Sequence, residues 1–229
     1  MFFDPLYFLM IAPALLLAFW AKRRIRSTYE VAQQQPASLS GAAAARHILD
    51  SAGLQSVGIE QVPGQLSDHY DPRQKVLRLS EAVYRSQSLA AVGIAAHEAG
   101  HAIQDARQYM PLVIRNAAVP AANFGSSASM IMLLLGMLLA QRTPFGHTLL
   151  LVGIGLFACV VFFQVVNLPV EFDASARAKA ELVSLGIVPE QQMGYVNSVL
   201  SAAAWTYVAA TLQAILTLLY YIIRFSGRR

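Results

Sequence analysis

Charged side chains are scarce in this chain of 229 residues. Asp, Glu, Lys and Arg together make up 13% of the sequence, about half of what soluble domains contain, while apolar residues make up 56%. The composition therefore argues against an ordinary soluble protein and favours one that spans a membrane. Cysteine is nearly absent as well: Cys159 stands alone and cannot form a disulfide within the chain. The sequence shows no internal repeat and no nucleic-acid motif, and its net charge of +4 is small, so we expect no nucleic-acid partner.

Four apolar runs are long enough to cross a bilayer as helices, which takes about 20 residues. They cover residues 5–21, 117–140, 148–170 and 201–223. Basic residues follow the first run, whereas a cleaved signal peptide carries its positive charge before the apolar stretch, so we interpret this run as an uncleaved anchor. A short polar turn, 141–147, joins the second and third runs, which must therefore be antiparallel neighbours.

The remaining residues predict a small soluble part made of helices and strands. Residues 38–53 favour a helix, residues 57–62 and 75–80 favour strands, and a further helix begins at Ser80, capped by Ser80 or Ser88. Residues 171–200 contain another helix, which ends near Gly186. The predicted fold is mainly α: an integral membrane protein with about four transmembrane helices and a small α+β domain. We divide the chain into an N-terminal anchor (1–21), a region with helices and short strands (22–115), a transmembrane hairpin (116–170), a helical region (171–200) and a C-terminal transmembrane helix with a basic tail (201–229).

Two histidines and a glutamate interrupt an otherwise mostly apolar stretch, AVGIAAHEAGHAIQDA (91–106). On a helix, the spacing of four between His97 and His101 puts both imidazoles on one face, where they can bind the same zinc ion. Glu98 lies beside the first histidine, and a carboxylate there can take a proton from the water that zinc activates. Two ordinary histidines on an exposed face are the simpler interpretation. The small apolar neighbours instead indicate a buried helix, in which ionisable groups need partners or a metal.

A catalytic zinc site usually takes three protein ligands, so one more is required. His147 lies in the turn between the second and third runs, across the membrane from the motif, and is excluded if the runs are assigned correctly. Glu171 directly follows the third run, and an antiparallel hairpin returns the chain to the side that it left, so Glu171 is our candidate. His69, Glu81 and Asp105 lie on the same side of the membrane as the motif in this assignment, so they also remain possible third ligands. Glu171 could also be a solvated residue in the first turn of a helix.

Four segments resemble the bacterial membrane zinc metallopeptidases of the YugP type, the neutral zinc metallopeptidase family, over nearly the whole chain: SDHYDP (67–72), VLRLS (76–80), AAHEAGHAIQ (95–104) and LPVEFDASARA (168–178). Their layout is similar to that of the HtpX and CAAX-prenyl-protease group. The resemblance implies a gluzincin with a zincin-like domain and one zinc ion per chain. In it, His97, His101 and Glu171 are the ligands and Glu98 is the general base. It also implies that KVLRLS (75–80) is the edge strand on which an extended peptide substrate lies.

The chain departs from the broader group at one position. Relatives carry an aspartate four residues after the third-ligand glutamate, where it orients a ligand histidine, but this chain has Ser175 there. Asp173 is the nearest aspartate, and it either takes over that role or lies at the start of a helix. His69, Tyr70 and Tyr195 are candidates for stabilising the oxyanion by residue type alone.

We therefore expect a zinc endopeptidase of the bacterial inner (cytoplasmic) membrane that cleaves membrane or membrane-associated proteins. Basic residues after the first run place the catalytic region (22–115) in the cytoplasm, whereas those after the fourth run favour a cytoplasmic C-terminus, which four crossings would not give. Either the basic tail lies outside, or residues 201–223 form a re-entrant or interfacial segment; we favour four crossings because the first run usually sets the orientation and residues 201–223 are long enough to cross. The alternative is a non-catalytic membrane scaffold with a structural zinc, although such a site needs no carboxylate between its histidines. A transporter is disfavoured because the runs hold almost no ionisable residues.

Overall fold

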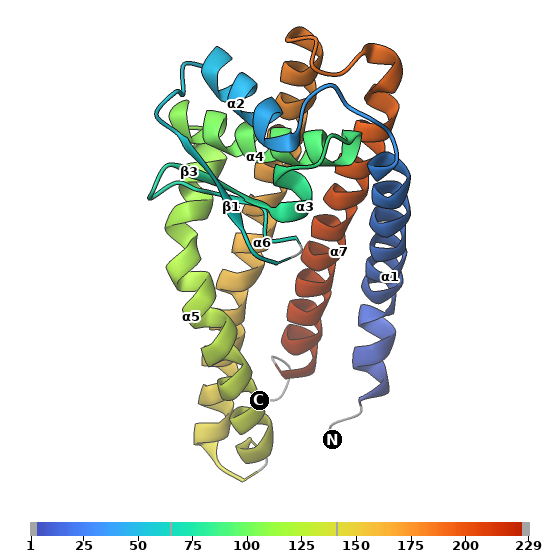
Figure 1. Cartoon of the computed structure of the whole chain (residues 1–229). Helices are drawn as coiled ribbons and strands as arrows, with labels where there is room; N and C mark the ends of the chain where they lie inside the picture. Colours follow the sequence, from blue (N-terminus) through green and yellow to red (C-terminus); the bar gives the residue numbers. More distant parts are fainter. Residues whose placement is uncertain (1–3, 65, 141, 226–229) are drawn as a thin grey trace. The chain divides into compact units, whose positions relative to one another are not determined.

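The computed structural model of the chain describes residues 4–64, 66–140 and 142–225, and helices predominate among them (Figure 1). The helices are α1 (Pro5–Gln33), α2 (Gly41–Ser51), α3 (Glu81–Tyr84), α4 (Leu89–Ala106), α5 (Met110–Leu139), α6 (Pro144–Ser184) and α7 (Met193–Phe225), with a 3₁₀ turn at Glu190–Gln192. The strands are β1 (Gly58–Val62), β2 (His69–Asp71) and β3 (Val76–Ser80). This architecture confirms the predicted mainly helical class with a small sheet.

The chain divides into two compact units. Unit 1 comprises Met1–Trp20, Ile114–Leu168 and Thr206–Arg229, and unit 2 comprises Ala21–Val113 and Pro169–Trp205. Four helical segments of the described residues, Pro5–Gln33, Met110–Leu139, Pro144–Ser184 and Glu190–Phe225, are long and apolar enough to cross a membrane. Unit 1 therefore consists of the apolar parts of these four segments. Unit 2 holds the sheet and the shorter helices, together with the remaining parts of the long ones.

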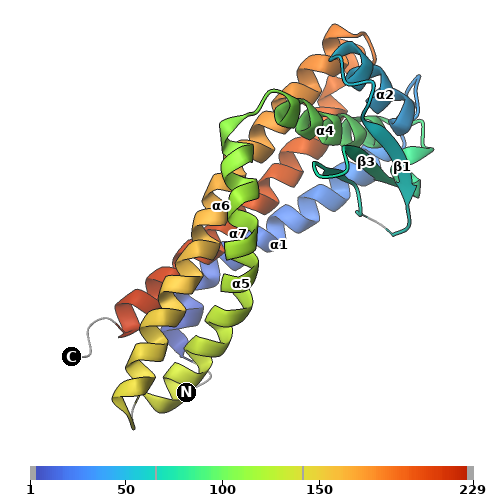
Figure 2. The same cartoon turned by 90° about the vertical axis from the view of Figure 1, so that its left-hand side faces the viewer.

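Within unit 1, the start of α1, the α5–α6 turn and the end of α7 lie at the same end, as both views show (Figures 1 and 2). Asp4, just before α1, accepts a hydrogen bond of 2.8 Å from Tyr220 and pairs with Arg224 at 3.3 Å. The hydroxyl of Thr211 on α7 donates to the carbonyl of Gln164 on α6, and Tyr221, further along α7, lies against Phe157, earlier on α6, so the two helices run antiparallel within unit 1. Within unit 1, the residues just before α1 and the last turn of α7 therefore lie against each other. Arg228 and Arg229 of the predicted basic tail lie outside the described residues.

The third apolar run and the predicted helix that follows it form one continuous helix, α6, of 41 residues. Pro169 lies inside it and removes one backbone donor, which a long apolar helix tolerates when neighbouring groups satisfy the freed carbonyl. Nothing else in residues 165–175 breaks a helix. The separate helix expected in residues 171–200 is thus the C-terminal part of α6, and it ends close to the predicted Gly186, which adopts a positive φ of 62°.

The sheet of unit 2 has the order β1-β3-β2, with β1 parallel and β2 antiparallel to β3. The expectation that residues 75–80 form the edge strand is therefore wrong, because β3 is paired on both sides. β2, which we did not predict, is an edge strand. The inward side chains Leu77 and Leu79 are fully buried in the core, against an alanine-rich surface of α2 and α4. Figure 2 shows α2 and α4 beside this sheet.

The single helix expected from Ser80 onward is two helices, α3 and α4, with a break at residues 85–88. The break arises from tertiary pairing, because residues 35–41 form backbone hydrogen bonds with residues 86–89 across it. Ser88 caps α4, since its hydroxyl accepts from the backbone N–H of Ala91 at 3.2 Å. Ser80 makes no such cap, and its hydroxyl instead donates to the carboxylate of Asp68.

Candidate metal centre

His97, Glu98 and His101, the HExxH motif of this chain, lie in the middle of α4, a helix whose residues are mostly buried. The backbone of α6 approaches α4 closely at Gly100: a Cβ on Gly100 would lie 2.5 Å from the carbonyl oxygen of Ala174. Only a glycine allows this distance, which is well inside van der Waals contact. The close approach brings the side chains of Glu171 and Ser175, both on α6, against the histidine-bearing face of α4.

Three side chains converge at this point. One carboxylate oxygen of Glu171, Oε2, lies 3.2 Å from Nε2 of His97 and 3.6 Å from Nε2 of His101. One donor atom from each of the three residues lies within 4.8 Å of the others, the one such group of three found among the described residues. Two atoms that each bind a tetrahedral zinc at about 2.0 Å are about 3.3 Å apart. The two measured separations therefore fit zinc, and so does the set of two imidazoles and a carboxylate.

The other ring nitrogens of the two histidines are engaged by neighbouring side chains. Nδ1 of His97 lies 3.1 Å from the hydroxyl of Ser175, and Nδ1 of His101 lies 3.0 Å from Oε1 of Gln104. These contacts leave the Nε2 atoms turned toward Glu171. The lone pairs of two ring nitrogens and the oxygens of a carboxylate are all acceptors, so the three groups repel one another at these distances. A cation among them, either a proton or a metal ion, removes this repulsion.

The electrostatics of the cluster favour that cation. Burial lowers the pKa of His101, but its contact with the Glu171 carboxylate and the negative charges of Glu98 and Glu171 outweigh burial, so that the pKa is raised overall. Glu98, His101 and Glu171 are each less than a tenth exposed. Because water screens these charges poorly, a positive charge at this place is stabilised by two carboxylates.

Asp173, a candidate from the sequence, lies close to the cluster but contacts neither histidine in any hydrogen bond that we find among the described residues. Its carboxylate accepts from the side-chain amide of Gln104 at 2.8 Å and pairs with Arg177 at 2.5 Å. The position that carries an aspartate in the broader group, Ser175, is the one that meets His97. The Ser175 hydroxyl, and not the Asp173 carboxylate, therefore contacts the ring of His97, and Asp173 lies inside α6 and not at the start of a helix.

Tyr70 and Asp105 bind each other. The Tyr70 hydroxyl donates to Oδ2 of Asp105 at 2.7 Å, and Lys75 pairs with the same oxygen at 2.5 Å. Burial raises the pKa of Tyr70, and the bond to Asp105 raises it further. The structure therefore uses Asp105 to attach β2 and the β2–β3 turn to the C-terminal end of α4.

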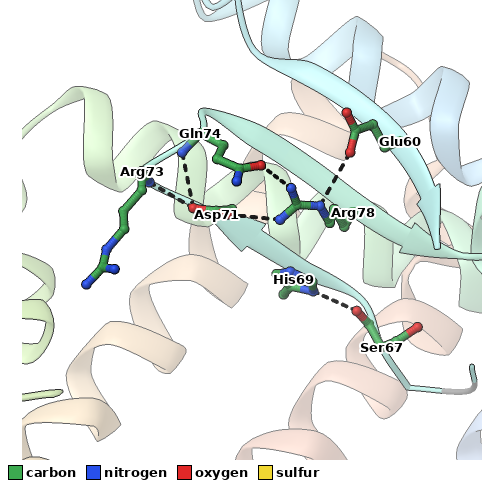
Figure 3. A network of polar contacts seen from close by, with 7 residues as sticks. All are labelled: Glu60, Ser67, His69, Asp71, Arg73, Gln74 and Arg78. Carbon is green, nitrogen blue, oxygen red and sulfur yellow. Dashed lines mark hydrogen bonds and ion pairs between the residues drawn. The ribbon is translucent and has the colours of Figure 1, made fainter. Parts of the chain in front are cut away.

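His69 is exposed and lies on the same face of the sheet as Asp71 and Arg78 (Figure 3). Strand alternation puts the side chain of Tyr70, the next residue, on the opposite face. Nδ1 of His69 donates to the carbonyl of Ser67 at 2.7 Å. On the same face, Arg78 pairs with Asp71 at 2.9 Å and with Glu60 at 3.3 Å. The structure does not bring His69 to the cluster.

Glu81 and His147 do not belong to the three-residue group found among the described residues. Glu81 begins α3, and Tyr195 is exposed near the start of α7. Sequence reasoning missed Gln104, which is fully buried and touches both ligand-bearing helices. Gln104 follows His101 by three residues, so both side chains lie on one face of the helix. A long polar side chain at such a position in an apolar stretch could have indicated a partner of His101.

Comparison with known proteins agrees with this geometry. Residues 7–226 match the model of a family described as "putative neutral zinc metallopeptidase". Among curated proteins, the "Putative membrane protease YugP" of Bacillus subtilis (strain 168) is 46% identical over 224 residues, which cover 97% of each chain. No solved structure matches. A family model that spans nearly the whole chain and a full-length relative of this identity lead to one conclusion: the chain belongs to the family that this model describes and is a relative of YugP.

Proposed function

We propose that this chain is a zinc-dependent membrane endopeptidase in which His97, His101 and Glu171 hold the metal and Glu98 is the general base. One observation carries the proposal: two imidazoles and a carboxylate converge in a buried place, with a second carboxylate next to the first histidine on the same helix. A structural zinc site is closed by its ligands and has no use for that second carboxylate. A hydrolytic site needs it.

Bound zinc would supply a Lewis acid that polarises the scissile carbonyl and makes water a stronger nucleophile at neutral pH. Glu98 accepts a proton from the attacking water, as its place one residue after His97 allows, and then gives that proton to the nitrogen of the departing amine. The carbon–nitrogen bond breaks, and one carboxylic acid and one amine leave. Ser175 and Gln104 contact the Nδ1 atoms of His97 and His101 and so keep both Nε2 atoms toward Glu171, where they would be available as zinc ligands.

We propose that the substrate binds along β2 rather than along β3. β2 is an edge strand of the sheet and packs against α4, the helix that carries the histidines. An extended peptide can extend a sheet at such an edge through main-chain hydrogen bonds. The contact of Tyr70 with Asp105 keeps β2 at a fixed place on α4, which would hold the peptide in register.

Substrates of this enzyme are proposed to be membrane or membrane-associated proteins. Glu171 belongs to the same continuous helix as the third membrane-crossing candidate, so the proposed metal ligand follows directly on a span. We further propose that the chain lies in the bacterial inner membrane with its active site on the cytoplasmic side. Lys22, Arg23 and Arg24 follow the first span and favour that orientation. Both chain ends would then be outside.

The test compares wild-type chain and Glu98→Gln, each loaded with zinc and reconstituted in vesicles together with a mixture of bacterial membrane proteins. New N-termini are labelled and identified by mass spectrometry. We expect new termini with the wild type and none with Glu98→Gln at equal zinc content, because the ligands are unchanged. Zinc in both proteins with cleavage by neither would support the scaffold alternative. Equal cleavage by both would disprove the role of Glu98.

A further inference from the structure

Gln104 is a polar side chain with no exposed surface, and the proposed hydrolytic step does not require it to react. Its amide makes three contacts: Oε1 lies 3.0 Å from Nδ1 of His101, and Nε2 donates to the carbonyl of Val170 at 2.8 Å and to Oδ2 of Asp173 at 2.8 Å. The side chain starts on α4 and reaches α6 on both sides of Glu171. It therefore contacts one proposed metal ligand and the flanks of another.

The partners of Gln104 fix which way its amide points. The Val170 carbonyl can only accept a hydrogen bond, and Arg177 donates to both oxygens of Asp173, so that carboxylate is an acceptor as well. Both hydrogens of the Gln104 amide are thus committed to α6. Its oxygen is left for His101, and an oxygen without a hydrogen requires that Nδ1 of the ring be the donor.

This requirement favours one of the two acceptors that flank the His101 ring. Oε1 of Gln104 lies 3.0 Å from Nδ1, whereas Oε2 of Glu171 lies 3.6 Å from Nε2, which is too far for a hydrogen bond. With the proton on Nδ1, a neutral ring carries its lone pair on Nε2, the atom that faces Glu171 at 3.6 Å. The outer end of the network is itself held in place, because the Arg177 guanidinium lies 5.6 Å from the centre of the Tyr109 ring. His97 has no equivalent device: the Ser175 hydroxyl rotates and can either donate or accept.

We propose that Gln104 is a positioning residue, which selects the Nδ1-protonated tautomer of His101 and fixes the backbone beside Glu171 so that both can bind one metal ion. The inference rests on the proposed function in that His101 is a metal ligand there. It extends that function by assigning the metal-ready state of the ring to a neutral amide instead of a carboxylate. Gln104 should therefore matter more for metal binding than Ser175 does.

The first measurement needs no change at Gln104. In zinc-free wild-type chain with ¹⁵N-labelled histidine, ring nitrogen shifts at a pH high enough to keep the rings neutral report the tautomer. The His101 signal is the one that disappears in His101→Gln. We expect its proton on Nδ1. A proton on Nε2 would overturn the proposal, and this result does not depend on whether the chain cleaves peptides.

The second measurement is zinc affinity by competition with a chelator, with the folded fraction checked by circular dichroism. Gln104→Met keeps the length of the side chain and removes the amide, and Gln55→Met makes the same change at an exposed glutamine of unit 2. We expect Gln104→Met to weaken zinc binding by about 10–100-fold and to mix the tautomers of His101. Gln55→Met should behave as wild type, and Ser175→Ala should lose less affinity than Gln104→Met.

Wild-type affinity in Gln104→Met, or an unchanged tautomer, would refute the positioning role. If Gln104→Met does not fold, the tautomer of the wild type still decides. If the wild type binds no zinc at all, the proposed function fails, while the ring nitrogen shifts still report whether Gln104 selects the tautomer. Failure of the function and failure of this inference are thus read from different experiments.

Discussion

Gly100 offers a sharp test of the geometry, because helix propensity and packing predict opposite effects for Gly100→Ala. Alanine stabilises the interior of a helix by about 1 kcal/mol relative to glycine. The added Cβ, however, would lie 2.5 Å from the Ala174 carbonyl oxygen, whereas ordinary contact begins at 3.4 Å. This oxygen belongs to the backbone, so a side-chain rotation cannot remove the clash. α6 must therefore shift by about 0.9 Å, the difference between these two distances.

A shift of this size is large for a metal site, in which ligand distances are defined to about 0.2 Å. Glu171 and Ser175 lie on the displaced part of α6, so both the carboxylate and the partner of His97 would move. We expect zinc affinity to fall by at least tenfold, as it does when the groups that orient ligands are lost. Overpacking should cost about 1–3 kcal/mol, which offsets the gain in helix propensity.

Gly93→Ala is the matched control on the same helix. There the added Cβ would lie 3.1 Å from a methyl group of Val196, a side chain that has to give way by only about 0.3 Å to reach ordinary contact. We expect zinc affinity to stay at the wild-type level and the free energy of unfolding to be unchanged or slightly higher. The assay is chelator competition on both variants. Equal zinc affinity in Gly100→Ala and Gly93→Ala would refute the claim that the α4–α6 approach builds the site.

Three further outcomes follow from the structure. Tyr70→Phe removes the bond to Asp105, so we expect a loss of about 1.5–3 kcal/mol in stability and a higher KM with unchanged zinc content, measured by chemical unfolding and peptide cleavage; an unchanged KM would argue against substrate binding along β2. In a chain with Cys159 replaced, single cysteines at 144 and in the C-terminal tail should react alike with an impermeant reagent on intact cells, and one at 60 should be protected. Labelling at 60 would contradict the cytoplasmic site. Removal of zinc by a chelator should lower the Tm, because the cluster then lacks the cation between its acceptors; an unchanged Tm on full removal would mean that the metal contributes nothing to the fold.

The elements that could be predicted from sequence are those set by local pattern. The four apolar runs, the faces of the HExxH helix and the cap at Ser88 each depend on residues close together in the chain. Glu171 was selected by the rule that a hairpin returns to the side it left together with the family resemblance, because the rule alone left other residues possible. The structure brings Glu171 to both histidines, and its role as a ligand stays a prediction.

The features that sequence reasoning missed depend on residues far apart in the chain. β2 has only three residues, and it exists as a strand because β3 pairs with it. The break between α3 and α4 follows from pairing with residues 35–41, against the helix propensity of the segment itself. Ser175 and Gln104 contact the histidines because α4 and α6 approach closely at Gly100. No local sequence pattern predicts this approach.

Zinc content tests the central claim, a metal site built by His97, His101 and Glu171, most directly. The measurement is elemental mass spectrometry on purified wild-type chain, Glu171→Ala and His147→Ala, all treated with excess zinc and then freed of unbound metal. Our account predicts one zinc per chain in the wild type and in His147→Ala, and much less in Glu171→Ala, which lacks a ligand. Full zinc content in Glu171→Ala, or loss of zinc in His147→Ala, would contradict it.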